Sequence, residues 1–342
     1  MAKLHCLVIG AFAAACTTEP GQPAQPPARA AQAAVPDAPA AKAKARRFEL
    51  AMTLVAPAWR DSGGVLRLWA PVPTAGADQD VEAMGELPAG FKRTREPRYG
   101  NEMVYFEGPA AQAPLPATLR FMVTRREIVR ARESGGASHT VSQAMHDELK
   151  RYLEPNRLVP VGGFVSDIAA KIGTTQAASP MQARAIYDYV LDHMQYKKEG
   201  TGWGTGSTKW ACESGYGNCT DFHALFISLC RTKQIPARFE IGYPLPEERG
   251  KKELAGYHCW AYFWLDTDGW VPVDISEADK NPKLTEYYFG SLSENRVRLS
   301  AERDIVLEPA QAGEPVNFFV RPYAEVDGKP QPVEWKLAIE DR

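Results

Sequence analysis

Cys219 lies between a glycine-rich turn and an apolar run in the sequence GYGNCTDFHALF, residues 215–226. Asn218 and Asp221 occupy the capping positions of a helix that would begin at Cys219, and the apolar residues that follow recur at helical spacing. Unpaired N–H groups and the positive end of the helix dipole stabilise an anion there. Because a thiol attacks as the thiolate, Cys219 is a candidate nucleophile that needs a base.

A base and an orienting carboxylate are predicted in GYHCWAYFWLDTDGWVPVDIS, residues 256–276, where DTDG indicates the turn of a hairpin. If the loop is odd-numbered and Trp264 pairs with Trp270, Asp274 lies on the face of His258, diagonally across the two strands. A shift of one residue would turn Asp274 to the other face. In the first register the carboxylate can orient an imidazole that accepts the thiol proton.

Three segments, GNCTDF, GYHCWAYFWL and GWVPVDIS, in this order and with these separations, resemble the core of the transglutaminase-like superfamily over roughly residues 160–290. The resemblance implies that Cys219 is the nucleophile, His258 the general base and acid, and Asp274 the orienting carboxylate. It also implies that the cysteine begins a helix and that the other two residues lie on adjacent strands.

The resemblance further implies an oxyanion hole, built from the backbone N–H of Cys219 and a donor from an upstream aromatic residue. Trp203 is preferred to Trp210 for this donor, because glycines on both sides would let its indole reach a backbone-lined site. A tryptophan that only packs under a loop is the alternative. Trp260, on the strand face of His258, and Tyr216 are predicted to contact substrate.

The cysteines and His223 could also have other roles. Cys212, Cys219, His223 and Cys230 suggest a zinc site, but their spacings contain no C-x-x-C pair, and nothing resembles the acidic calcium loops of the animal enzymes. No metal and no cofactor are therefore predicted. His223 is a rival base without an evident carboxylate partner, and is assigned to the surface or to the surroundings of the site. Pairing among Cys212, Cys230 and Cys259 in an oxidising compartment stays open.

The amino terminus has the pattern of an export signal. Residues 1–16, MAKLHCLVIGAFAAAC, combine Lys3 with an apolar run too short to span a bilayer and small residues before Cys16. AAAC resembles a bacterial lipoprotein box, which implies lipidation of Cys16, and an ordinary cleaved signal is the alternative. Residues 17–45, rich in Ala and Pro, are predicted to be a disordered tether. We therefore expect an exported protein, periplasmic or anchored to the outer membrane by lipid.

The rest of the chain predicts an α+β fold. Residues 46–135 alternate apolar and polar positions between Pro and Gly clusters, which favours an N-terminal β-sandwich-like domain. Residues 150–293 would form the transglutaminase-like catalytic domain, a helix packed on an antiparallel sheet, and residues 294–342 a C-terminal β extension. Within the catalytic domain, Ser179 and Gln182 predict the capping box of a second helix.

The expected activity is acyl transfer through a thioester on Cys219, with a peptide or protein amide of the cell envelope as substrate. Water as the acceptor, slightly favoured, makes the protein a protease or amidase, and an amine makes it a cross-linking enzyme. A formal net charge of −2 gives no electrostatic reason to expect a nucleic-acid partner. A non-catalytic envelope binding module that keeps the fold is the alternative.

Overall fold

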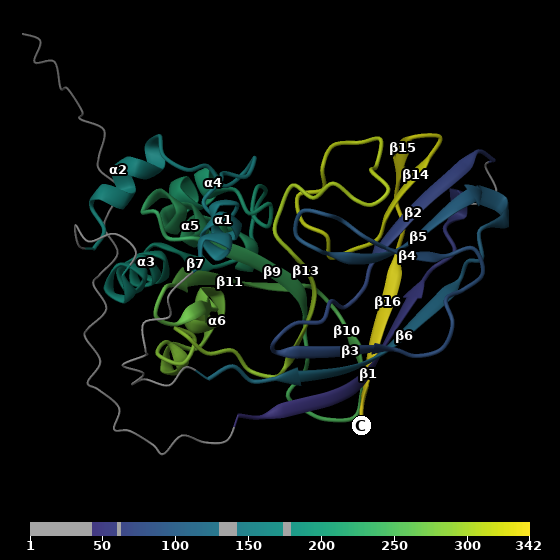
Figure 1. Cartoon of the computed structure of the whole chain (residues 1–342), viewed down its shortest axis with the longest axis horizontal. Helices are drawn as coiled ribbons and strands as arrows, with labels where there is room; N and C mark the ends of the chain where they lie inside the picture. Colours follow the sequence, from purple (N-terminus) through teal and green to yellow (C-terminus); the bar gives the residue numbers. More distant parts are fainter. Residues whose placement is uncertain (1–42, 60–62, 130–141, 174–178) are drawn as a thin grey trace, which may run out of the picture. The chain divides into compact units, whose positions relative to one another are not determined.

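The computed structural model describes residues 43–59, 63–129, 142–173 and 179–342 (Figure 1). The predicted signal sequence, the lipidation site Cys16 and nearly all of the predicted tether lie outside these ranges. The described residues belong to one compact unit, Ala33–Arg342.

Two five-stranded antiparallel sheets make up a β-rich region, with the strand orders β10-β16-β1-β6-β3 and β15-β14-β2-β5-β4. Apolar residues of both sheets share one buried cluster, so the inner faces pack together as in a β-sandwich. The strands are β1 (Ala45–Leu54), β2 (Val65–Pro71), β3 (Gln79–Ala83), β4 (Lys92–Arg95), β5 (Glu102–Pro109), β6 (Ala117–Arg126), β10 (Lys251–Leu254), β14 (Tyr323–Val326), β15 (Lys329–Gln331) and β16 (Trp335–Asp341), with the 3-10 helix η2 (Ala110–Gln112) between β5 and β6.

Strands from opposite ends of the chain are neighbours in both sheets. β16 pairs with β1 from Phe48↔Asp341 to Leu54↔Trp335, and β14 pairs with β2. The alternation seen in the first strand is real, because Phe48 and Leu54 are both fully buried. Residues at the C-terminus thus complete sheets that begin at the N-terminal end of the described chain.

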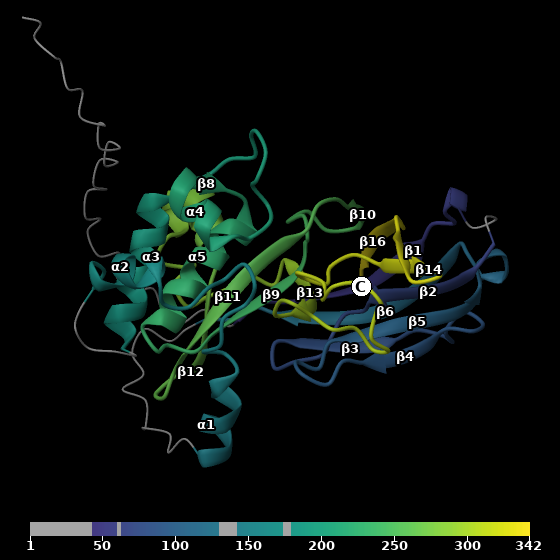
Figure 2. The same cartoon turned by 90° about the horizontal axis from the view of Figure 1, so that it is seen from above.

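A third sheet, four-stranded and antiparallel, carries the helices of the α+β core in the order β12-β11-β9-β13. Helix α5 packs against β11 and β9 (Figures 1 and 2). The strands are β9 (Ala237–Pro244), β11 (His258–Leu265), β12 (Gly269–Val273) and β13 (Arg296–Ala301), with a small parallel pair β7 (Gln195–Tyr196) and β8 (Tyr216–Gly217). The helices are α1 (Gln143–Lys150), α2 (Phe164–Ala170), α3 (Pro180–His193), α4 (Thr208–Ser214), α5 (Cys219–Thr232), α6 (Ile275–Lys280) and the 3-10 helix η3 (Pro282–Leu284).

Helix α5 lies in the centre of this core. Its residues from Cys219 to Arg231 are all buried, whereas the sequence predicted a single core-facing stripe. A helix that is buried all round must be surrounded by other elements, and α2, α3, α4 and α6 supply the contacts that the sheet does not.

The β11–β12 hairpin has the predicted register, because Trp264 pairs with Trp270 and Leu265 with Gly269. Gly269 has φ +72°, as expected for the left-handed residue that closes a three-residue hairpin loop. The odd-numbered loop is therefore confirmed.

Helix α3 begins as predicted, but its capping box does not form. The Ser179 hydroxyl accepts the backbone N–H of Gln182 at 3.1 Å. The Gln182 side chain donates instead to the carbonyl of Ile172 at 3.2 Å, and its own oxygen has no partner. None of the helices in the described ranges combines the length and the apolar character needed to cross a membrane.

Candidate functional site

Cys219 is the first residue of α5, and the predicted capping box holds that end of the helix. The Asn218 side chain accepts the backbone N–H of Thr220 at 2.9 Å, and the Asp221 carboxylate accepts the backbone N–H of Asn218 at 3.0 Å. Across the described parts of the chain, no group accepts the backbone N–H of Cys219. The thiol, in a residue only 1% exposed, therefore lies beside a free helix N–H.

His258 links the thiol to the carboxylate of Asp274. Its Nε2 lies 2.7 Å from Asp274 Oδ2, and its ring also hydrogen-bonds to the Cys219 thiol. Because Nε2 is used by Asp274, Nδ1 is left for the sulfur. The fold thus brings together the three residues that the motifs singled out.

Asp274 has a partner for each lone-pair direction. It is the N-cap of α6, where Oδ1 accepts the Ser276 hydroxyl and the Glu277 backbone N–H, both at 3.2 Å. Oδ2 accepts His258 and the Nη1 of Arg296, at 3.0 Å from the latter. The side chain is fully buried, so these donors hold it in one orientation.

The electrostatics favour a charged sulfur and a charged ring. Burial alone would raise the pKa of the Cys219 thiol, but hydrogen bonds with Cys259 and His258 hold it well below its ordinary value. Burial lowers the pKa of His258, yet the charge and hydrogen bond of Asp274 outweigh it and raise the pKa to about 10. Between these two values the pair rests as thiolate and imidazolium.

His223 is buried between Cys219 and Asp274, so of the two positions that the sequence left open it has the one in the surroundings of the site and not the one on the surface. The backbone N–H of Ile275 donates to its Nε2 at 3.2 Å, so Nδ1 carries the proton and donates to the Cys219 carbonyl at 2.8 Å. Burial lowers its pKa to about 4, which keeps the ring neutral. His223 therefore ties the segment after Asp274 to the first turn of α5. The local sequence pattern does not indicate the contact with Ile275, because that residue is distant in sequence.

The cysteines in the described ranges, Cys212, Cys219, Cys230 and Cys259, are all free, so the possible pairing of Cys230 with Cys259 is not found. Cys259 instead faces the site, with its sulfur 3.5 Å from His223 Nδ1. Within the described ranges, no three His, Cys, Asp or Glu side chains are grouped so that they would hold a metal ion.

The structure does not place either upstream indole N–H, that of Trp203 or that of Trp210, in the predicted oxyanion hole. The Trp203 N–H donates to the carbonyl of Gly200 at 3.2 Å, so this donor is already used. The Trp210 indole nitrogen is buried without a partner, and its ring packs against Gly202. The backbone N–H of Cys219 is thus the free donor beside the sulfur.

Trp260 is fully buried, so the prediction that it contacts substrate is wrong. Its indole N–H donates to Glu240 at 3.0 Å, and the Arg296 guanidinium covers its ring at 4.8 Å. Arg296 therefore contacts both Trp260 and Asp274. No local sequence motif predicted this role. Tyr216 is half-buried and packs edge-on against Trp210, and its contact with substrate stays a prediction.

A cavity of about 500 Å³ reaches His258 from outside the core. It is lined by His258, by Glu277, Tyr287 and Tyr288 after β12, and by Lys44 and Glu127 from the β-rich region. Glu277 Oε1 lies 3.9 Å from His258 Nε2. This cavity gives a ligand access to the imidazole side of the site.

Comparison with known proteins agrees with this arrangement. Residues 166–275 match the family model of the transglutaminase-like superfamily, a stretch that includes Cys219, His258 and Asp274. This part of the chain is a transglutaminase-like domain.

The similarity to other proteins extends beyond that domain. An uncharacterized protein of Haemophilus influenzae is 27% identical over 327 residues, covering 84% of this chain and 87% of its own. The crystal structure of a candidate cysteine protease from Cytophaga hutchinsonii has the same fold, with a TM-score of 0.50, 13% identity, and coverage of 87% of this chain and 98% of that one. The periplasmic domain of TgpA from Pseudomonas aeruginosa gives a TM-score of 0.37 at 13% identity, covering 71% and 94%.

Proposed function

We propose that the protein is a cysteine-dependent enzyme that transfers an acyl group from a peptide or protein amide through a thioester on Cys219. The observation that supports this most directly is the hydrogen-bonded line of thiol, imidazole and carboxylate at the start of α5. A sulfur held as the thiolate beside a charged imidazole is already activated for attack.

In the first half of the proposed reaction, the Cys219 thiolate attacks the amide carbon. The negative charge that develops on the carbonyl oxygen is stabilised by the free backbone N–H of Cys219. The His258 imidazolium gives its proton to the leaving amine as the C–N bond breaks, which leaves a thioester and a neutral ring. Trp203 would add a second oxyanion donor only after releasing Gly200.

In the second half, the neutral His258 takes a proton from the acceptor, which attacks the thioester. The C–S bond breaks, and the thiolate and imidazolium are restored. We propose water as the usual acceptor, because it is the default nucleophile and is small enough to enter through the cavity that reaches His258. An amine acceptor would give cross-linking instead. Action in the cell envelope, with a lipid anchor at Cys16, is part of the same proposal.

The test compares the wild type with Cys219→Ala in an envelope extract that contains a labelled primary amine. Label in new products indicates transfer, and new fragments without label indicate cleavage. Both should disappear in Cys219→Ala and persist in the control Cys212→Ala, since burial raises the pKa of Cys212 to about 11. Iodoacetamide at neutral pH should alkylate Cys219 much faster than Cys212.

The alternative, a binding module without catalysis, makes the opposite prediction. Equally slow alkylation of all four described cysteines, with no product that depends on Cys219, would favour the module. The free thiols and their different surroundings make the two outcomes easy to separate by mass spectrometry.

A further inference from the structure

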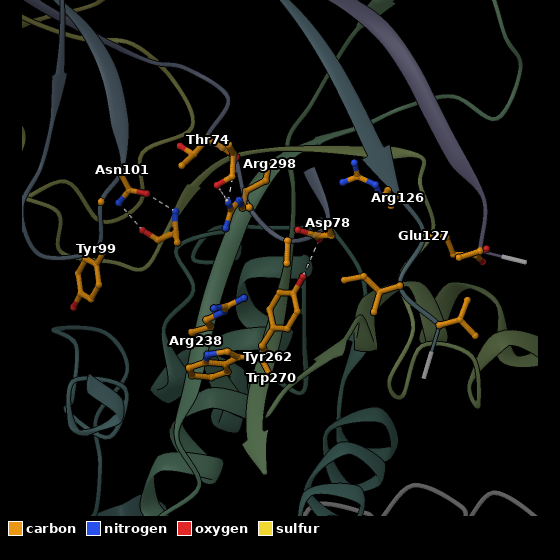
Figure 3. A pocket seen from close by; sticks show the side chains of 18 of the residues that line it. Thr74, Asp78, Tyr99, Asn101, Arg126, Glu127, Arg238, Tyr262, Trp270 and Arg298 are labelled. Atoms are coloured by element: carbon orange, nitrogen blue, oxygen red, sulfur yellow. Dashed lines mark hydrogen bonds between the residues drawn. The ribbon is translucent and has the colours of Figure 1, made fainter. Parts of the chain in front are cut away.

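A second cavity, of about 690 Å³, lies between the four-stranded core sheet and the loops of the β-rich region (Figure 3). We call it the arginine cleft, and the lining residues that matter here are Asp78, Tyr99, Arg238, Tyr262, Trp270 and Arg298. The volume falls in the range of cavities that hold small molecules or short peptide segments.

Arg238, on β9, is held at the floor of the arginine cleft, and part of its hydrogen-bonding capacity stays unused. Its guanidinium carbon lies 4.4 Å from the ring centre of Tyr262 and 4.5 Å from that of Trp270. Cation–π contacts of this kind fix the position of the group while leaving its N–H edges available. Its Nη2 lies 3.2 Å from Glu240, but in the described ranges no acceptor pairs with its buried Nε.

Arg298 differs from Arg238, because both of its terminal nitrogens are occupied by the protein, although its Nε, like that of Arg238, pairs with no described acceptor. Nη1 donates to Glu240 at 3.0 Å, and Nη2 donates to the carbonyls of Thr74 and Ala75 at 3.1 and 2.8 Å. This side chain therefore joins the core sheet to the loop before β3. Arg238 makes no comparable backbone contact in the described chain.

Positive charge is in excess at the floor of the arginine cleft. Arg125, Arg238 and Arg298 surround Glu240, and Arg125 also lies 2.6 Å from Asp78. Three guanidinium groups thus share two carboxylates. The remaining charge is about +1, because the other charged lining residues add none: Arg126 is paired with Asp80, and the charges of Arg95 and Glu127 are opposite. One carboxylate would neutralise this charge, and a dianionic phosphate would exceed it.

Donors are also in excess. The Tyr99 hydroxyl and the Trp270 indole line the arginine cleft, and no described residue accepts a hydrogen bond from either. The side-chain acceptors Asp78, Asn101 and Glu127 are occupied. Asp78 is ion-paired, and the Asn101 amide bonds at both ends to the backbone of Ala301, at 2.7 and 2.8 Å. Glu127 accepts the Tyr287 hydroxyl at 2.7 Å and the Lys44 backbone N–H at 3.1 Å. A ligand that fits this surface brings acceptors and one negative charge.

We propose that the arginine cleft binds a carboxylate of a peptide, with Arg238 as the residue that recognises it. That the peptide is the substrate rests on the proposed function. Tyr262 lies on the same face of β11 as His258, four residues away, or about 13 Å. Glu127 lines both this cleft and the cavity at His258, so the two adjoin. The carboxylate would then lie about four residues from the amide attacked by Cys219.

The test is a calorimetric titration of the full chain carrying Cys219→Ala, which removes turnover and so separates binding from catalysis. Three probes are compared: acetyl-tetraalanine as the free acid, the same peptide as the C-terminal amide, and an amide in which one alanine is replaced by glutamate. The free acid, the glutamate peptide or both should bind at least about tenfold more tightly than the neutral amide. The pattern tells whether the carboxylate is terminal or on a side chain.

Variants in the same background assign the preference to the arginine cleft. Arg238→Gln should reduce it to within about twofold, and the isosteric Tyr99→Phe should weaken it without disturbing the fold. Arg126→Gln is the matched control, because Arg126 lines the same cavity but is paired with Asp80. Absence of binding, equal binding of acid and amide, or a preference that survives both Arg238→Gln and Tyr99→Phe would overturn the proposal. Activity lost in Cys219→Ala but intact carboxylate binding would leave both proposals standing.

Discussion

The reactivity of single residues in this site is set by what surrounds them. Cys219 and Cys230 lie on one helix and are equally buried, yet burial raises the pKa of Cys230 well above its usual value while that of Cys219 is held well below it. The difference is the pair of hydrogen bonds that the Cys219 thiol makes with Cys259 and His258. The charge of His258 depends in turn on Asp274, so this carboxylate acts on the sulfur through the imidazole.

Asp274→Asn should move the alkaline limb of the pH profile of Cys219 reactivity to lower pH. His258 stays protonated up to its pKa of about 10, so the active ion pair is present below that pH and above the thiol pKa. Without the carboxylate, burial should take the ring pKa below its ordinary value of about 6.5. Alkylation of Cys219 by iodoacetamide and the proposed catalysis should fall at pH 7.5, by at least about a hundredfold for catalysis.

Glu277→Gln is the control for that substitution, because Glu277 lies 3.9 Å from the same nitrogen but is partly exposed and paired with Lys280. Its alkaline limb should stay near the wild-type position. An Asp274→Asn protein whose profile matches the wild type would show that the ion pair does not depend on Asp274.

The residue-level prediction from sequence succeeded where the signal was local. A capping pattern placed Cys219 at a helix start, and a four-residue turn signal predicted the hairpin, one of whose two registers brings Asp274 to His258 and is the one observed. It failed for Trp260 and left the position of His223 open. Their burial depends on contacts with Glu240, Arg296 and Ile275. These residues come from other segments, so the sequence around Trp260 and His223 does not indicate the contacts.

At the scale of elements, one carboxylate joins the glycine-rich loop to the start of α5. Asp221 accepts the backbone N–H groups of Gly204 at 2.6 Å and Gly206 at 2.9 Å, in addition to that of Asn218. Its role is therefore wider than the predicted cap. The carboxylate reaches these donors because Gly217 has no side chain: a Cβ there would lie 2.4 Å from Asp221 Oδ2.

Gly217→Ala should therefore disturb the helix start without touching any of the reacting groups. The added methyl must displace the Asp221 carboxylate, and overpacking of this kind costs about 1–3 kcal/mol. We expect a lower midpoint in urea unfolding and slower alkylation of Cys219, because its helix end loses its anchor. Lys209→Ala, an exposed substitution on neighbouring α4, should change neither measurement. Wild-type alkylation in a stably folded Gly217→Ala would show that the reactivity of Cys219 does not depend on the position of the Asp221 carboxylate.

At the scale of the whole described chain, the C-terminal strand β16 joins the N-terminal strand β1 to the segment that precedes β11. β16 lies between β1 and β10, and β10 comes from the segment that precedes β11. Strand alternation predicted β structure at both ends of the chain. It did not predict that the ends pair, because a contact between residues so far apart has no local signal and depends on the packed sheet.

Asp341→Asn tests that connection. Arg46, only 1% exposed, donates to Asp341 at 2.8 and 3.0 Å, and its remaining nitrogen reaches Pro246 and Asn295 beside the cavity. Losing the charged partner of a buried guanidinium should lower the free energy of unfolding by about 1.5–3 kcal/mol, measured by urea denaturation at pH 7.

The pH dependence of this loss has a definite sign. The hydrogen bond from Arg46 holds the pKa of Asp341 below its ordinary value, so its contribution is complete above the unfolded pKa of about 3.9 and disappears as pH falls through the lowered folded pKa. The stability difference between the wild type and Asp341→Asn should therefore shrink in acid. Glu340→Gln, which removes an exposed ion pair with Arg342, should cost little at any pH. Equal losses in the two variants would mean that the buried Arg46 contact does not hold β16 in place.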